Sequence, residues 1–280
     1  MRASSSGPPT SVKKKKGKPK PQARLTAFYT QHFFRIWLTI NIRTCVFDIR
    51  ERGAAADMDE CEKAKSVLDA QQQHWNKTYR EEPDFFGEEP SYAAQKAAEV
   101  FKKEGASKIL DLGAGQGRDS LFFARNGFKV YALDYSETAV EAIRQKARQL
   151  VLSNAVAAMC HDLRKPLPFK DESFDACYCH MLYCMALCTS ELESLFQEVK
   201  RVLKPNALNV YTVRNTKDPH YGKGIHRGED MYEVGGFIVH FFSKEKVEQL
   251  AKGYDILGID EFEEGELPRK LFLVKLRKKA

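Results

Sequence analysis

Hydrophobic positions from residue 91 onward alternate between two periods. Short apolar runs such as Lys108–Leu112 and Lys129–Asp134 predict buried strands. Between such runs, apolar residues recur at helical spacing. The segment 190–204 shows this stripe most clearly, with Leu192, Leu195, Phe196, Val199, Val202 and Leu203 on one helix face. Alternating strands and helices predict a parallel sheet covered by helices on both faces.

The same pattern predicts seven strands and six helices. Only a short segment, Glu263–Arg269, joins the last two strands, which suits a hairpin and makes the last strand antiparallel. The predicted fold class is therefore α/β, a doubly wound, mostly parallel seven-stranded sheet with an antiparallel last strand. Strands are expected at 108–112, 129–134, 155–160, 173–180, 207–214, 254–260 and 270–276, and helices at 62–76, 91–104, 117–126, 136–150, 190–204 and 243–251.

Composition divides the 280 residues into two parts. Hydrophobic residues make up 43%, enough for a sizeable core, and no apolar run approaches the roughly 18 residues of a membrane-spanning helix. The net charge of +7 resides in residues 1–57, which hold twelve Lys or Arg and three Asp or Glu. Residues 58–280 are slightly acidic. We therefore expect a basic, largely disordered extension at 1–57 and one folded domain at 58–280.

Three roles are open for the basic extension: an organellar presequence, a nuclear-localising or nucleic-acid-binding arm, or an appendage without catalytic importance. The chain shows no secretory signal pattern, and its seven cysteines include no C-x-x-C pair, so reduced thiols are expected. The predicted location is cytoplasmic, with nuclear or mitochondrial targeting as the alternative.

A glycine-rich turn between the strand at 108–112 and the following helix carries the first chemical signal. Gly113, Gly115 and Gly117 allow a tight turn and close approach of a ligand to the backbone. Their G-x-G-x-G spacing differs from the G-x-G-x-x-G dinucleotide pattern. Asp111 precedes the turn, and Asp134 ends the next strand, where a carboxylate can accept both hydroxyls of a ribose.

These motifs resemble the class I S-adenosylmethionine-dependent methyltransferases, which have a Rossmann-like fold. The resemblance covers about residues 90–277. Within this family, the sequence is most similar to the small-molecule enzymes of the tellurite-resistance and thiopurine type. One departure is that Asn206-Ala207 stands where the family commonly has Gly-Gly. The motifs that carry it are LDLGAGQG, ALDYS, MCHDL, FDACYCHMLY and EVKRVLKP.

The resemblance implies S-adenosylmethionine as cofactor, no metal, and a role for each matching residue. Asp111 and the backbone of Gly113, Ala114, Gly115 and Gly117 would hold the methionine end of the cofactor. Asp134 would bind the ribose and Tyr135 would lie against the adenine. Asp162 would accept from the adenine amine, and the N–H of Leu163 would donate to the ring.

Acceptor-binding residues are expected around the carboxyl ends of the strands. His180 ends a strand and is predicted to be a general base or a substrate-orienting group. Aromatic residues before the fold suggest a lid, and the glycine-rich segment 215–242 suggests a second lid in the form of a long loop. Substrate contacts are predicted for Trp75, Tyr79, Phe86, Tyr183 and Arg214.

A small-molecule acceptor is the predicted substrate. The acidic body and the lack of a separate substrate domain argue against nucleic acid, except through the basic extension. Three alternatives stay open: methylation of a soft metalloid such as arsenite by Cys184 and Cys188 with Cys179 or Cys160, methylation of a protein, and a cofactor-binding module without catalysis. Nothing in the sequence indicates an oligomeric state.

Overall fold

A computed structural model describes residues 66–67, 69–265 and 268–280. The predicted extension at 1–57, its boundary with the domain and the first residues of the helix expected at 62–76 lie outside this range. Residues 66–67 and 69–81 are helical in the structure, so the helix runs five residues beyond the predicted end.

The central sheet has seven strands in the order β3-β2-β1-β4-β5-β10-β9. All neighbours pair in parallel except β10, which is antiparallel to both β5 and β9. The predicted fold class, with its antiparallel last strand, is confirmed. The strands are β1 (Lys108–Leu112), β2 (Lys129–Asp134), β3 (Val156–Cys160), β4 (Phe174–His180), β5 (Leu203–Arg214), β9 (Tyr254–Glu264) and β10 (Arg269–Lys278).

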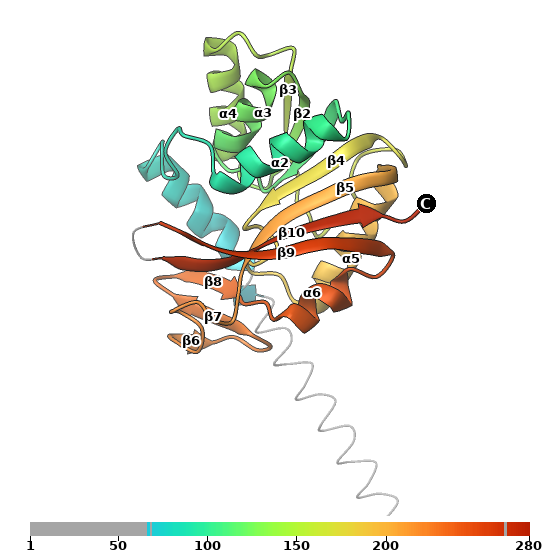
Figure 1. The fold of residues 1–280 in the computed structure, drawn as a ribbon. Helices are drawn as coiled ribbons and strands as arrows, with labels where there is room; N and C mark the ends of the chain where they lie inside the picture. Colours follow the sequence, from blue (N-terminus) through green and yellow to red (C-terminus); the bar gives the residue numbers. More distant parts are fainter. Residues whose placement is uncertain (1–65, 68, 266–267) are drawn as a thin grey trace, which may run out of the picture. The chain divides into compact units, whose positions relative to one another are not determined.

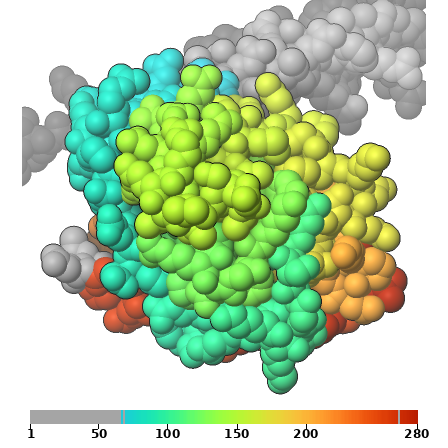
Figure 2. All heavy atoms as spheres, turned by 90° about the horizontal axis from the view of Figure 1, so that it is seen from above, coloured from blue at the N-terminus to red at the C-terminus, as the bar shows by residue number. Residues whose placement is uncertain are grey.

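Helices cover both faces of this sheet (Figure 1). One face carries α2 (Tyr92–Lys103), α3 (Arg118–Arg125) and α4 (Glu137–Gln149), and the other carries α5 (Thr189–Val202) and α6 (Lys244–Leu250). In Figure 2 the green segment that contains α3 and α4 forms the middle of the visible face. Both sides of the sheet are therefore buried, as the apolar strand sequences require.

Side chains of β4 divide between two hydrophobic cores. Tyr178 packs in the core beneath α2, α3 and α4, whereas Cys177 and Cys179 pack in the core beneath α5 and α6. This follows from the alternation of side chains along a strand. The strand thus ends with His180 on the same side as Tyr178, and the two rings are parallel, with centroids 6.4 Å apart.

The segment 215–242 differs from the prediction of a long loop. It contains a three-stranded antiparallel sheet of β6 (Ile225–His226), β7 (Met231–Val234) and β8 (Phe237–His240). Strands of two to four residues are too short to give a visible hydrophobic period. Their order depends on distant partners: the side chain of Gln71 donates to Gly236 O (3.0 Å) and accepts from Ile238 N (3.2 Å).

Candidate active site

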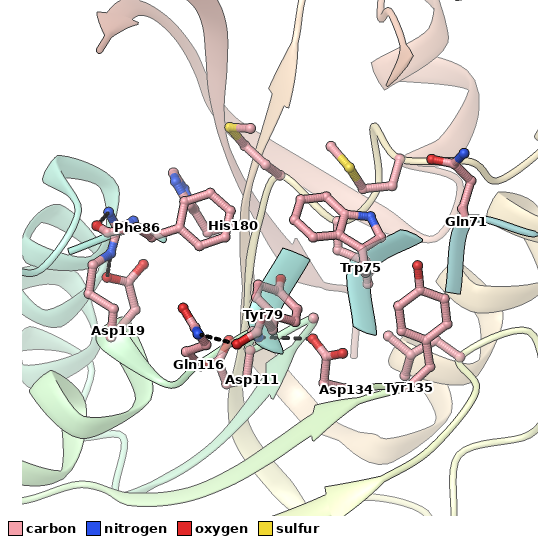
Figure 3. Close-up of a pocket in the computed structure, with 18 of the residues that line it drawn as sticks. Gln71, Trp75, Tyr79, Phe86, Asp111, Gln116, Asp119, Asp134, Tyr135 and His180 are labelled. Atoms are coloured by element: carbon pink, nitrogen blue, oxygen red, sulfur yellow. Dashed lines mark hydrogen bonds and ion pairs between the residues drawn. The ribbon is translucent and has the colours of Figure 1, made fainter. Parts of the chain in front are cut away.

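The carboxyl ends of β1, β2, β3 and β4 meet beneath the helix at 69–81, and a pocket opens between them (Figure 3). It contains about 1270 Å³ of space, part of it open to solvent. Parallel strands adjacent in the sheet bring residues distant in sequence to this one edge. Twelve predicted site residues line it: Trp75, Tyr79, Phe86, Asp111, Gly113, Ala114, Gly115, Asp134, Tyr135, Asp162, Leu163 and His180.

The glycine turn forms the floor of the pocket. The N–H groups of Gly113 and Ala114 both donate to Leu133 O, at 2.8 and 3.0 Å, which ties the turn to the end of β2. Gly113 has a φ of +68°, and a Cβ there would lie 2.6 Å from Leu182 Cβ. A Cβ at Gly115 would lie 3.1 Å from the Tyr79 hydroxyl. Side chains at Gly113 and Gly115 would therefore crowd the residues that line the pocket.

Two buried carboxylates flank the turn. Asp134 accepts from Gly115 N and Ser136 N, both at 2.9 Å, with one oxygen each. Each oxygen keeps a lone pair, the arrangement that a vicinal diol requires. Asp111 accepts from Ser120 Oγ at 2.5 Å. Burial raises the pKa of Asp134 to about 6 and that of Asp111 to about 7, so a cationic ligand would find Asp111 only partly ionised at neutral pH.

Asp162 is held by its neighbour Arg164. Its Oδ1 accepts from the backbone N and the Nε of Arg164, both at 3.0 Å, and its Oδ2 accepts from an Arg164 terminal nitrogen at 2.9 Å. A second terminal nitrogen of Arg164 pairs with Asp69 on the helix at 69–81. One lone pair of Oδ2 remains for an amine, so the predicted role of Asp162 is compatible with its contacts.

Aromatic rings from the helix and the loop after it form the roof. The centroids of Trp75 and Tyr79 lie 5.2 Å apart, and those of Trp75 and Phe86 lie 6.2 Å apart. Trp75 also packs on Phe237 of β8 at 4.7 Å, so the small sheet buttresses the roof. Gln116 fixes the loop, because its side-chain amide donates to Glu82 O and accepts from the backbone N–H of Phe85. These rings give the pocket an apolar upper wall.

His180 lies at the end of β4 behind Phe86 in Figure 3. Both of its ring nitrogens have partners: Nδ1 lies 2.9 Å from Thr212 Oγ1, and Nε2 lies 3.3 Å from Glu264 Oε2. Sequence analysis missed Glu264, and no sequence signal connects it with the pocket. The β9–β10 hairpin carries it there.

A second missed group is the side chain of Asp119 in the first turn of α3, which also lines the pocket. Asp119 is buried and accepts from Ser91 N (2.8 Å), Ser91 Oγ (2.7 Å) and Tyr178 Oη (3.0 Å). Burial tends to raise its pKa, but the charges of His180 and Arg118 and the Ser91 hydrogen bonds outweigh burial and leave the pKa below the usual value. An ionised carboxylate thus forms part of the pocket wall. The Ser91 N-cap that precedes the helix at 92–103 is the only sequence signal for this contact.

Two predicted substrate residues do not line the pocket. Tyr183 is fully buried in the core between Phe196 and Tyr211, at centroid distances of 4.8 and 5.1 Å. Arg214 makes a buried bidentate ion pair with Asp218, with Nε–Oδ2 at 2.9 Å and a second contact at 2.5 Å. Their predicted substrate contacts are therefore wrong: Tyr183 is enclosed by the rings of the core, and Arg214 is engaged in a local ion pair.

The clustered cysteines also serve the core. Burial raises the pKa of Cys177 and Cys179 well above the usual value and that of Cys184 to about 11, so their thiolates are disfavoured. Cys160 is exposed at the end of β3. Among the residues that the structure describes, no three His, Cys, Asp or Glu side chains are grouped to hold a metal ion. The metalloid alternative has no support in this arrangement.

Comparison with known proteins decides the family. Residues 109–206, which include the glycine turn and the ends of β1 to β4, match the model described as a methyltransferase domain. The chain contains a class I methyltransferase domain. The predicted family is thereby confirmed, and the strand order with its single antiparallel strand agrees with it.

Relatives of this methyltransferase domain are distant. The biotin biosynthesis bifunctional protein BioHC of Saccharophagus degradans is 34% identical over 44% of this chain and 21% of its own length. The chain spans less than half of the other curated relatives as well. Among solved structures, a Burkholderia thailandensis 1,6-didemethyltoxoflavin-N1-methyltransferase with bound S-adenosylhomocysteine superposes with a TM-score of 0.61, at 15% identity over 78% of this chain and 90% of that one.

A Pyrococcus horikoshii protein is 25% identical and has a TM-score of 0.54 over 72% of this chain and 99% of its own. The fold that the two proteins share thus extends over nearly the whole of that protein. Of the helices that the structure describes, none is both long and apolar enough to cross a membrane.

Proposed function

We propose that this protein transfers a methyl group from S-adenosylmethionine to a small-molecule acceptor. One observation supports this most: the bare glycine turn and the buried Asp134 carboxylate border one pocket in a methyltransferase domain. The sulfonium of the cofactor makes its own methyl group electrophilic, so the protein's contribution is to position the acceptor in line with it.

The cofactor would lie along the strand ends. Asp134 would accept from the two ribose hydroxyls with its remaining lone pairs. Tyr135 and Leu163 would border the adenine, and Asp162 would accept from its amine. The Gly113–Gly117 turn and the partly ionised Asp111 would hold the methionine end, whose ammonium group complements the carboxylate.

The acceptor would lie between the aromatic roof and His180. Trp75 and Phe86 are the roof residues of this region, and Met181 and Met185 are apolar neighbours in the pocket wall. A roof anchored at both ends supports a small acceptor over a protein segment, because an open groove would be needed to admit a peptide. The cytoplasmic location and the role of residues 1–57 stay predictions.

The test is calorimetric binding of S-adenosylmethionine to the full chain and to Asp134→Ala. Hydrogen bonds to a charged group contribute about 1.5–3 kcal/mol, so we expect the variant to bind at least about tenfold more weakly. Asp171→Ala is the matched control, since that carboxylate is exposed and pairs with Arg201, away from the pocket residues. Turnover of small amines and thiols, followed as S-adenosylhomocysteine formation, would then identify the acceptor. No cofactor binding by the folded chain would refute the proposal.

A further inference from the structure

His180 and Glu264 meet at the edge of the pocket although they come from different parts of the sheet. His180 ends β4, and Glu264 ends β9, which is separated from β4 by β5 and β10. Their side chains are 14% and 21% exposed, so water has little access to the contact. Because only His180 lines the pocket, Glu264 acts on the pocket through the ring of His180.

Hydrogen-bond donors determine where the protons lie. The backbone N–H of Met181 donates to Thr212 Oγ1 at 3.0 Å, so that oxygen already accepts one bond. The Thr212 hydroxyl can then donate its proton to His180 Nδ1 at 2.9 Å. In the neutral ring the proton is therefore on Nε2, which lies 3.3 Å from Glu264 Oε2.

The cationic ring leads to the same result. Its Nδ1–H would donate to the second lone pair of Thr212 Oγ1, and its Nε2–H would still donate to Glu264. In neither state does a ring nitrogen of His180 keep a free lone pair. A general base needs such a lone pair within reach of the proton that it removes.

The surrounding charges keep the Glu264 carboxylate ionised. Burial tends to raise its pKa, but the hydrogen bond and charge of His180, followed by Arg118 and Arg269, lower the pKa below the usual value. The Tyr178 ring lies parallel to the His180 ring, and the charge of His180 also lowers the pKa of Asp119. Contacts with Thr212 and Glu264 therefore fix the ring.

We propose that Glu264 is a positioning residue of the acceptor site, which holds His180 in a fixed orientation with no ring lone pair free to take a proton from the methyl acceptor. This inference rests on the proposed function and deepens it. An acceptor in this site must be nucleophilic at neutral pH without giving a proton to His180, as thiolates and amines of low pKa are. Alcohols, whose proton must be removed by a base, are disfavoured.

The test is the nitrogen NMR spectrum of the full chain with ¹⁵N-labelled histidine, in which His180→Gln assigns the signals of His180. We expect Nε2 to be protonated from pH 6 to pH 8. Glu264→Leu removes the acceptor and should produce a mixture of tautomers. Glu264→Gln keeps an acceptor oxygen and should restore the Nε2–H form. Glu263→Leu, the matched change at an exposed neighbour, should leave the His180 signals unchanged.

An unprotonated Nε2 in the unaltered protein would overturn the proposal, and so would His180 signals that are the same in Glu264→Leu and Glu263→Leu. The first outcome needs no variant, so it remains decisive if Glu264→Leu does not fold. Once an acceptor is known, Glu264→Leu should lower kcat by about tenfold or more, with rescue by Glu264→Gln. Failure of the proposed function would appear separately, as absence of S-adenosylmethionine binding in calorimetry.

Discussion

Replacement of Asp111 by Asn removes a charge that the fold buries at the pocket floor. Asp111 is 2% exposed, and burial is the main reason why its pKa rises from 3.8 to about 7. The hydrogen bond from Ser120 opposes this rise but does not cancel it. Asn is nearly the same size and can still accept that bond, so Asp111→Asn tests the charge with little change in packing.

The raised pKa determines the size and the sign of the effect. A shift of about three units corresponds to about 4 kcal/mol, since one unit is about 1.4 kcal/mol. Well below about pH 4 the Asp111 carboxyl is protonated in both the folded and the unfolded state, so its burial as a charge does not reduce stability. The cost grows as pH rises to 7 and is complete above it. Between pH 5 and pH 8, Asp111→Asn should therefore gain about 3 kcal/mol of stability relative to the unaltered protein.

Urea unfolding at several pH values between 5 and 8 measures this difference. The control is Asp175→Asn, because hydrogen bonds from Lys204 and the Lys108 and Ser107 N–H groups outweigh burial and lower that pKa to about 2. Its stabilisation is complete at pH 5 and above, so its loss should be constant across the range. A constant difference for Asp111→Asn as well would refute the reasoning.

Cofactor binding supplies a second readout of the same charge. If the cofactor's ammonium binds only ionised Asp111, a pKa of about 7 makes the affinity rise about tenfold between pH 6 and pH 8. Calorimetry in buffers of different ionisation enthalpy should show proton release on binding near pH 7. Asp111→Asn should bind weakly and lose both effects.

Three further predictions test other parts of the site. Gly113→Ala should not bind S-adenosylmethionine in calorimetry, because the added Cβ would overlap Leu182 in the pocket wall. The control Gly105→Ala has a similar φ of +70° but open space around the added Cβ. It should lose only about 1–2 kcal/mol of stability in urea unfolding. Asp218→Asn should lower the free energy of unfolding by about 3 kcal/mol, because it leaves the buried guanidinium of Arg214 without its ion-pair partner. The folded variant should still bind the cofactor normally. The double variant Cys184→Ser/Cys188→Ser should keep cofactor binding, because Cys184 is a core residue and Cys188 is a partly buried one; loss of binding in a folded protein would contradict this structural role.

Sequence patterns were sufficient for the elements that form locally. Each strand of the main sheet has an apolar run, and α2 and α4 begin at serines whose side chains cap the helix. The glycine turn and the carboxylate at Asp134 were also visible, because strand, turn and helix follow one another directly in the chain. Parallel strands then bring their carboxyl ends to one edge, so most of the pocket floor was predictable.

What the sequence by itself determined is thus the order of elements and the residues at the strand ends, since both depend on short-range periodicity. Only the tertiary structure decided which polar side chains are already satisfied. Arg214 pairs with Asp218 four residues away, and Glu264 reaches His180 through the β9–β10 hairpin. Such contacts depend on the direction of each side chain and the competition among partners, which a one-dimensional pattern does not contain.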